Sequence, residues 1–229
     1  MTQSPFDRTA PRDDDPAARA PRAGDRSLST RDAGRVVLVG GGVRTGKSRF
    51  ALERARALGR RRLFVATAQP LDQEMADRIA DHARTRGDDF RTVEEPLAVP
   101  ELLLGVRDTD VVVVDCLTLW LSNMLMPAGT AATDVEGRLG ALAEALGRRA
   151  FHVVVVTNEV GMGLVPETPL GRRFRDLTGR AHQLLAGIAD EIYFGALGVM
   201  LRLRPEPVAI QPAPAPSSSS SAWAGAGAR

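Results

Sequence analysis

The sequence predicts a single α/β domain in which helices flank a doubly wound, mostly parallel sheet. Short apolar runs alternate with segments of helical composition between residues 34 and 204. A glycine loop follows the first apolar run and precedes a segment rich in Arg, Ala, Leu and Glu. Strands that alternate with helices, with a glycine loop after the first strand, are typical of the P-loop NTPase type of this fold.

The glycine loop covers residues 41–48 and reads Gly-Gly-Val-Arg-Thr-Gly-Lys-Ser, which matches the pattern G-x-x-x-x-G-K-[ST]. In this pattern backbone N–H groups surround phosphate oxygens. Lys47 would then reach the β- and γ-phosphates, and the Ser48 hydroxyl would bind Mg²⁺. Lys47 is the only lysine in a chain that otherwise uses arginine. Because a compact ammonium fits a phosphate cradle better than a planar guanidinium does, this lone lysine favours a nucleotide site.

Composition limits the other classes of function. The formal net charge is +2, and the short run Arg60–Arg62 falls in a loop, so charge does not indicate nucleic-acid binding. Cys116 is the single cysteine, which excludes an internal disulfide and offers no zinc cluster. No apolar stretch reaches the ~20 residues that span a bilayer, and the N-terminus lacks the apolar core of a secretory signal. We therefore expect a cytoplasmic protein without a membrane span.

Local composition predicts the elements in order. Residues 1–33 are polar and aperiodic and residues 205–229 are rich in Pro, Ala and Ser, which predicts a disordered leader and tail around a domain at 34–204. Apolar runs predict strands at residues 35–39, 62–66, 90–93, 110–114, 151–156, 191–194 and 198–203. Helical composition predicts helices at residues 47–58, 71–86, 99–107, 117–126, 135–149 and 168–188.

Polar residues follow several predicted strands at their carboxyl ends, where open α/β sheets bind ligands. Asp115 follows the apolar run at 110–114 in the Walker-B arrangement, from which a carboxylate holds Mg²⁺ directly or through water. Thr67-Ala68-Gln69 follows the second strand, and Asn158-Glu159 follows the strand at 151–156. These segments predict a crevice at one edge of the sheet.

His82 lies on the predicted helix at 71–86. One face of this helix, within an arc of about 80°, is formed by Leu71, Met75, Ile79 and His82. A histidine on an apolar face is usually a core residue, but Arg78 and Arg86 lie on or beside the same face, and a buried stripe rarely carries arginines. Two interpretations remain open: a core histidine, or a functional histidine on the half of the helix that faces an anion.

Four segments together carry a resemblance to a known family. They are GGVRTGKSRFA at 41–51, ATAQPLDQEMADRIADHARTRG at 66–87, VVDCLTLWLSNML at 113–125 and VTNEVGMGLVPETPLGRRFRDLTGRAHQ at 156–183. The chain resembles the bifunctional adenosylcobinamide kinase / adenosylcobinamide-phosphate guanylyltransferase family of cobalamin assembly. Many NTPases share the glycine loop, whereas the blocks TNEVGMG-x-VPE and EM-x-x-RI-x-x-H-x-x-x-R are narrow signals, and these two decide the resemblance.

The resemblance implies two reactions on one scaffold. In the first, the γ-phosphate of ATP or GTP passes to the aminopropanol hydroxyl of adenosylcobinamide. In the second, a histidine attacks the α-phosphate of GTP, and GMP then passes to adenosylcobinamide phosphate to give adenosylcobinamide-GDP. The family histidine corresponds to His82. A neutral imidazole, with an unperturbed pKa of about 6.5, is a suitable nucleophile near neutral pH.

The resemblance also implies the rest of the site and the partners. His82 and Lys47 are the implied catalytic residues, and Ser48 and Asp115 are the implied Mg²⁺ ligands. The implied nucleotide contacts are Gly41, Gly42, Val43, Arg44, Thr45, Gly46, Lys47, Ser48, Arg49, Thr67, Ala68, Gln69, Thr85, Arg86, Gly87, Asp88, Glu94 and Asp115. The implied partners are ATP, GTP, adenosylcobinamide and its phosphate, without nucleic acid, and the implied assembly is a homotrimer.

Two alternatives stay open at this point. The first is a P-loop small-molecule kinase with one activity, in which His82 is structural. The second is a nucleotide-binding switch, which lacks support because the sole lysine lies in the glycine loop and leaves none for an Asn-Lys-x-Asp guanine motif. Covalently retained label from α-labelled GTP would support the transferase, corrinoid phosphorylation without retained label would support the kinase, and the absence of both results would support the switch.

Overall fold

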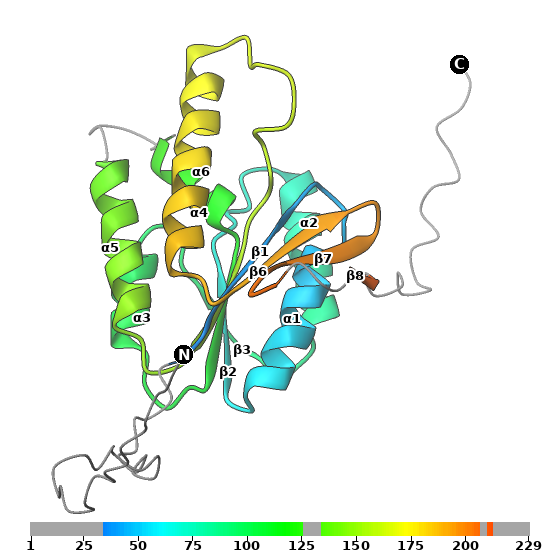
Figure 1. Ribbon diagram of the computed structural model, residues 1–229, viewed down its shortest axis with the longest axis vertical. Coiled ribbons are helices and arrows are strands. Elements are labelled where there is room, and N and C mark those ends of the chain that lie inside the picture. Colours follow the sequence, from blue (N-terminus) through cyan, green and yellow to red (C-terminus); the bar gives the residue numbers. More distant parts are fainter. Residues whose placement is uncertain (1–33, 126–133, 207–209, 213–229) are drawn as a thin grey trace, which may run out of the picture. The chain divides into compact units, whose positions relative to one another are not determined.

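The computed structural model describes residues 34–125, 134–206 and 210–212, and these residues form an eight-stranded sheet with helices on both faces (Figure 1). The strand order is β3-β2-β4-β5-β1-β6-β7-β8. Strands β3 to β6 run parallel in this order, whereas β7 and β8 continue the sheet with antiparallel pairing. The predicted doubly wound, mostly parallel α/β fold is confirmed.

The strands lie close to the predicted ranges. Their bounds are β1 (Val36–Gly41), β2 (Arg62–Ala66), β3 (Arg91–Glu94), β4 (Val111–Asp115), β5 (His152–Val156), β6 (Glu191–Ala196), β7 (Val199–Arg204) and β8 (Ile210–Pro212). The central strands β1, β4 and β5 are buried on both faces, which explains their near-continuous valine runs. β8 lies within the segment that the sequence predicts to be disordered, and the leader and most of this tail lie outside the described residues.

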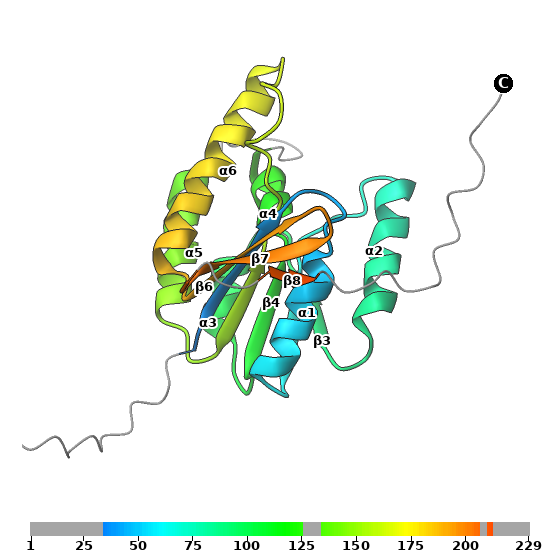
Figure 2. The same ribbon diagram turned by 45° about the vertical axis from the view of Figure 1, so that its right-hand side comes forward.

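The helices divide between the two faces of the sheet (Figures 1 and 2). Their bounds are α1 (Lys47–Leu58), α2 (Gln73–Arg86), α3 (Val99–Gly105), α4 (Leu117–Leu125), α5 (Val135–Gly147) and α6 (Pro169–Ile188). On one face α3, α4, α5 and α6 cover one set of alternate strand residues, including Leu38 and Val114. On the other face α1 covers the opposite set, including Val39 and Val113. None of the described helices is long and apolar enough to cross a membrane.

One boundary differs in a way that matters for the site. The predicted helix at 71–86 begins at Gln73, because Asp72 takes the N-cap position and its Oδ1 accepts the Met75 N–H at 2.7 Å. Leu71 therefore precedes the helix and is 75% exposed. Met75 and Ile79 are only half-buried, so the apolar face of α2 does not form part of a core.

The topology brings three strand ends together. β5 lies between β1, which leads into the glycine loop, and β4, which ends at Asp115. From β1 the chain crosses one face through α1 to reach β2, and from β5 it crosses the other face through α6 to reach β6. Crossovers on opposite faces leave a crevice at the carboxyl ends of these strands, where doubly wound proteins bind ligands.

Candidate functional site

The glycine loop has the backbone geometry of a phosphate cradle. Gly46 takes the left-handed conformation (φ 88°) immediately before α1, and Gly41 has a φ of 138°. A Cβ atom on Gly41 would lie 2.3 Å from the carbonyl oxygen of Gly195 on the neighbouring strand β6. Only glycine tolerates this approach, which holds the start of the loop against the sheet.

The N-terminus of α1 is open to an anion. Its first turn carries no acidic residue, and its N-cap residue, Gly46, provides no side-chain hydrogen bond to the helix. The first backbone N–H groups of a helix have no partner within the helix, and the helix dipole favours negative charge there. The predicted phosphate contacts Val43 and Arg44 lie exposed at the tip of the loop, and Arg49 pairs with Glu53 one turn along α1.

Lys47 is buried inside this loop, with 7% of its surface exposed. Its Nζ donates a hydrogen bond to the Gly42 carbonyl oxygen at 2.5 Å, and the Thr45 hydroxyl donates to the same oxygen at 3.0 Å. Burial lowers the pKa of Lys47, while the nearby Asp115 and Cys116 oppose that shift. The ammonium thus points back into its own loop, in reach of any phosphate held there.

Asp115 meets the loop at Ser48, whose hydroxyl hydrogen-bonds to the carboxylate. Burial raises the pKa of Asp115, whereas the hydrogen bond from Ser48 and the neighbouring side chains of His82, Lys47 and Arg86 act in the opposite direction. A hydroxyl and a carboxylate oxygen side by side are the donors that a nucleotide-bound Mg²⁺ uses, with phosphates and water completing its octahedron. The two residues fit that ion.

Thr67, predicted to contact the nucleotide, is fully buried at the end of β2. Its hydroxyl donates to the Cys116 carbonyl oxygen at 2.8 Å and accepts the Cys116 N–H at 2.7 Å. It therefore joins the carboxyl ends of β2 and β4. The neighbouring Ala68 and Gln69 are half-buried.

The second half of α2 faces the same strand ends. Arg86 lies over the Phe64 ring, with its guanidinium carbon 4.2 Å from the ring centroid. Burial lowers the pKa of Arg86, while the carboxylates of Asp115 and Glu94 act against that shift. His82 is exposed, and it lies close enough to Asp115 to oppose the rise in the pKa of that carboxyl group. The structure does not bury His82, so its interpretation as a core histidine is wrong.

The remaining predicted contacts lie around the end of α2. Gly87 ends the helix with a φ of 75°, Asp88 is exposed beside it, and Glu94 is exposed at the end of β3. Nothing is described of the Thr85 side chain. Arg78 pairs with Glu74 at 2.7 Å on the exposed surface of α2, so of the two arginines near His82 only Arg86 turns towards Asp115.

The structure adds residues that the predicted site did not include. After β5, the Glu159 N–H donates to the Gly41 carbonyl oxygen at 2.9 Å, which ties this segment to the glycine loop. Glu159 also lies 3.6 Å from Nδ1 of His182, whose Nε2 is 2.8 Å from the Thr157 hydroxyl. The signal in the sequence was the polar Thr-Asn-Glu run after a buried strand, and the partner His182 on α6 could not be inferred from it.

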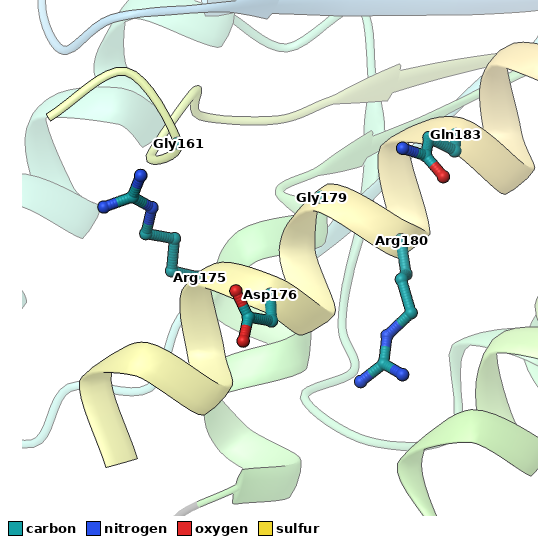
Figure 3. A pocket seen from close by; sticks show the side chains of 6 residues that line it. All are labelled: Gly161, Arg175, Asp176, Gly179, Arg180 and Gln183. Atoms are coloured by element: carbon teal, nitrogen blue, oxygen red, sulfur yellow. The ribbon is translucent and has the colours of Figure 1, made fainter. Parts of the chain in front are cut away.

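A surface pocket of about 500 Å³ lies between α6 and Gly161 of this segment (Figure 3). It is lined by Gly161, Arg175, Asp176, Gly179, Arg180 and Gln183. The side chains of Arg175 and Arg180 point away from one another, and Arg180 pairs with Glu136 at 3.0 Å. Because the pocket is open and includes no residue of the glycine loop, it is not the phosphate site.

Comparisons with known proteins agree with this geometry. Residues 37–203 match the family model described as "Cobinamide kinase / cobinamide phosphate guanyltransferase". The "Bifunctional adenosylcobalamin biosynthesis protein CobP" of Pseudomonas aeruginosa is 40% identical over 170 residues, which cover 74% of this chain and 97% of that protein. The proteins named CobU with the same description in Escherichia coli K12 and Salmonella typhimurium LT2 are each 36% identical over 181 residues, covering 74% of this chain and 99% of each relative. The chain belongs to the cobinamide kinase / cobinamide phosphate guanyltransferase family.

Proposed function

We propose that this chain is a bifunctional enzyme of cobalamin biosynthesis. It phosphorylates the aminopropanol hydroxyl of adenosylcobinamide with ATP or GTP, and it then transfers GMP from GTP to adenosylcobinamide phosphate through a guanylyl-histidine. The observation that carries this proposal is that Arg86, one turn after His82, stacks on Phe64 of β2, which pairs with β4 and its terminal Asp115, so that the end of α2 lies on the same side of the sheet as the glycine loop. One bound triphosphate can therefore meet both sets of groups.

In the phosphoryl transfer, the substrate hydroxyl oxygen attacks the γ-phosphorus and its proton passes to solvent. The bond from that phosphorus to the bridging oxygen breaks, and the nucleoside diphosphate leaves. The loop N–H groups and Lys47 stabilise the charge that is shared by the β- and γ-phosphate oxygens. Lys47 exchanges its bond to the Gly42 carbonyl for phosphate oxygens. Mg²⁺, held by Ser48 and Asp115, would neutralise charge between the β- and γ-phosphates.

In the guanylyl transfer, a ring nitrogen of His82 attacks the α-phosphorus of GTP, the bond from that phosphorus to the bridging oxygen breaks, and pyrophosphate leaves. The phosphate group of adenosylcobinamide phosphate then attacks the same phosphorus and displaces the imidazole. Arg86, one helical turn from His82 on the same side of α2, supplies positive charge beside the reacting phosphates. The exposure of His82 suits a group that must meet two successive substrates.

The kinase-only alternative now has less support. It required a structural His82, and an exposed imidazole outside the core offers no packing role. The switch alternative has no supporting contact among the described residues.

A labelling experiment tests the proposal. The protein is incubated with Mg²⁺ and GTP labelled at either the α- or the γ-phosphate, denatured and separated from free nucleotide. Label from α-labelled GTP should remain bound, resist mild base and be released by mild acid, as a phosphoramidate is, while γ-label should not remain. Adenosylcobinamide phosphorylation without any retained α-label would reduce the function to a kinase.

We also propose a cytoplasmic homotrimer, as the family resemblance implies. Support comes from the loop between β5 and α6, where Met162, Leu164 and Val165 are 80%, 95% and 68% exposed. Adjacent exposed apolar side chains commonly mark a protein interface. Light scattering that gives three times the mass of one chain is the expected result, and the mass of a monomer would contradict it.

A further inference from the structure

The helix that carries His82 is weakly attached to the domain. None of the α2 side chains that the structure describes is buried, whereas α1 buries five residues, including Phe50 and Leu52. In Figure 2 α2 lies outside α1, away from the sheet. Since the apolar face of α2 is not packed in a core, something other than hydrophobic burial must fix the orientation of this helix.

An arginine on α1 holds the end of α2. Both oxygens of the Asp89 carboxylate accept hydrogen bonds from Arg56, one from Nε at 2.8 Å and one from Nη2 at 3.0 Å. The same Nη2 donates to the Arg86 carbonyl oxygen, in the last turn of α2, at 3.0 Å. Arg62 adds a further bond to Asp89 at 3.1 Å. We call the three residues Arg56, Asp89 and Arg86 the α2 clamp.

The clamp is built on a buried ring. Phe90 follows Asp89, is 6% exposed, and lies under the guanidinium groups of Arg56 and Arg62, 5.4 and 5.8 Å from its centroid. The hydrogen bonds from Arg56 lower the pKa of Asp89, so the carboxylate is charged throughout the neutral range. A bidentate guanidinium–carboxylate pair has a fixed geometry that single surface ion pairs lack.

The clamp links the two halves of the site. Lys47 and Ser48 begin α1 and Arg56 lies in its last turn, so one rigid helix connects the phosphate cradle to the clamp. On α2, the clamped Arg86 also stacks on Phe64 and faces Asp115. His82 lies one turn earlier, ~6 Å along the helix axis. The position of His82 relative to the loop therefore depends on the clamp.

We propose that the bonds from Arg56 to Asp89 and to the Arg86 carbonyl oxygen position His82 for attack on the α-phosphorus, and that Arg56 and Asp89 have no part in phosphoryl transfer. Arg56 and Asp89 are positioning residues, because they act through the helix and are not among the groups proposed to contact a substrate. This inference rests on the proposed function. A purely structural clamp would instead lower both activities together, in proportion to lost stability.

The test compares two arginines with the same bonding pattern. Arg138 also binds both oxygens of a carboxylate, Glu101, and donates to a carbonyl oxygen, that of Leu97 at 2.9 Å, but it does so on the opposite face of the sheet. Arg56→Ala, Asp89→Asn and Arg138→Ala are each measured for three quantities. These are the rate of α-label incorporation from GTP, the rate of adenosylcobinamide phosphorylation, and the midpoint of thermal unfolding.

Arg56→Ala should slow α-label incorporation about 10- to 100-fold, since small misplacements of a reacting group have effects of this size. Phosphorylation should stay within about twofold of the wild-type rate, because the loop keeps its own contacts. Asp89→Asn, which retains one acceptor, should fall between Arg56→Ala and the wild type. Arg138→Ala should leave both rates unchanged, even where its thermal midpoint falls as far as that of Arg56→Ala.

The outcomes separate the two proposals. If the wild type incorporates label and Arg56→Ala incorporates it equally fast, the clamp inference fails while the proposed function stands. An equal loss of both activities in Arg56→Ala, in step with the thermal midpoint, also overturns the positioning role. If the wild type itself retains no α-label, the guanylyl-histidine fails and the clamp inference fails with it.

Discussion

The helices α1 and α2 lie on the same side of the sheet and are attached to it in opposite ways. α1 packs four buried apolar residues against the strands, and the loop before it lies against β6, where Gly41 closely approaches Gly195. α2 has no buried side chain among those described and is held by hydrogen bonds at its end. The two helices therefore differ in role within the proposed mechanism. α1 presents a preorganised cradle for phosphates, and α2 carries a nucleophile whose position depends on few contacts.

This contrast has a chemical reason within the proposed mechanism. Charge stabilisation is most effective when the donors do not reorganise, which favours the buried, fixed Lys47. A covalent carrier must instead meet GTP and later the corrinoid phosphate, which favours an exposed His82.

Lys47→Ala should lower phosphoryl transfer by at least about 100-fold, because the γ-phosphate loses its compensating cation in a shielded site. Lys47→Arg should fail as well, because a guanidinium does not fit the space that encloses the 7%-exposed ammonium. Steady-state kinetics with ATP and with GTP measure both variants. Near-wild-type activity of Lys47→Arg would show that the cradle is looser than the buried lysine implies.

Asp115→Asn should abolish phosphorylation and yet stabilise the protein without ligand. Burial raises the pKa of Asp115 in the folded state, so the stability it contributes is present at low pH and is lost as pH rises through that pKa. At neutral pH the neutral amide removes a buried charge and can still accept from Ser48. Thermal unfolding should show a higher midpoint for Asp115→Asn at pH 7 and a smaller difference near pH 4. A lower midpoint at pH 7 would contradict this account.

Replacing His182 by a side chain that does not titrate should reduce the pH dependence of the unfolding free energy. Burial lowers the pKa of His182 despite the nearby Glu159. The unfolded imidazole, with a pKa of about 6.5, thus binds protons more readily than the folded one. The unfolding free energy should therefore decrease as the pH falls below that value. Urea unfolding of His182→Gln should be measured from about pH 5 to 8, where histidine titrates. Its unfolding free energy should depend less on pH than that of the wild type. An unchanged slope would mean that His182 is not the group responsible.

Truncation should have the smallest effect. A protein of residues 34–212 should unfold at the same temperature as the full chain, because the predicted leader and tail lack the apolar content to offset their ordering entropy. Stopping at residue 205 removes β8 and exposes the edge of β7, so it should lower the midpoint by a few degrees. A large loss of stability in the 34–212 protein would show that an end of the chain packs on the domain.

Only part of the fold and of the candidate site can be predicted from the sequence. The strands, the glycine loop and Asp115 were predictable because short apolar runs and a fixed motif encode them locally. The weak packing of α2 was not predictable, because Met75 and Ile79 give the helix an apolar face whether or not anything covers it. Likewise Arg56 and Asp89 are 33 positions apart, and Thr67 and Cys116 are 49 apart, so only the folded chain reveals these pairs.

The most direct test of the account is the His82→Ala protein. Because His82 is exposed, the substitution should change the unfolding free energy by no more than about 0.5 kcal/mol. The protein should retain no label from α-labelled GTP and lose guanylyl transfer, while it still converts adenosylcobinamide to its phosphate through Lys47, Ser48 and Asp115. Label that persists in His82→Ala would move the nucleophile to another residue, and a parallel loss of both activities would contradict the separation of the two reactions between α1 and α2.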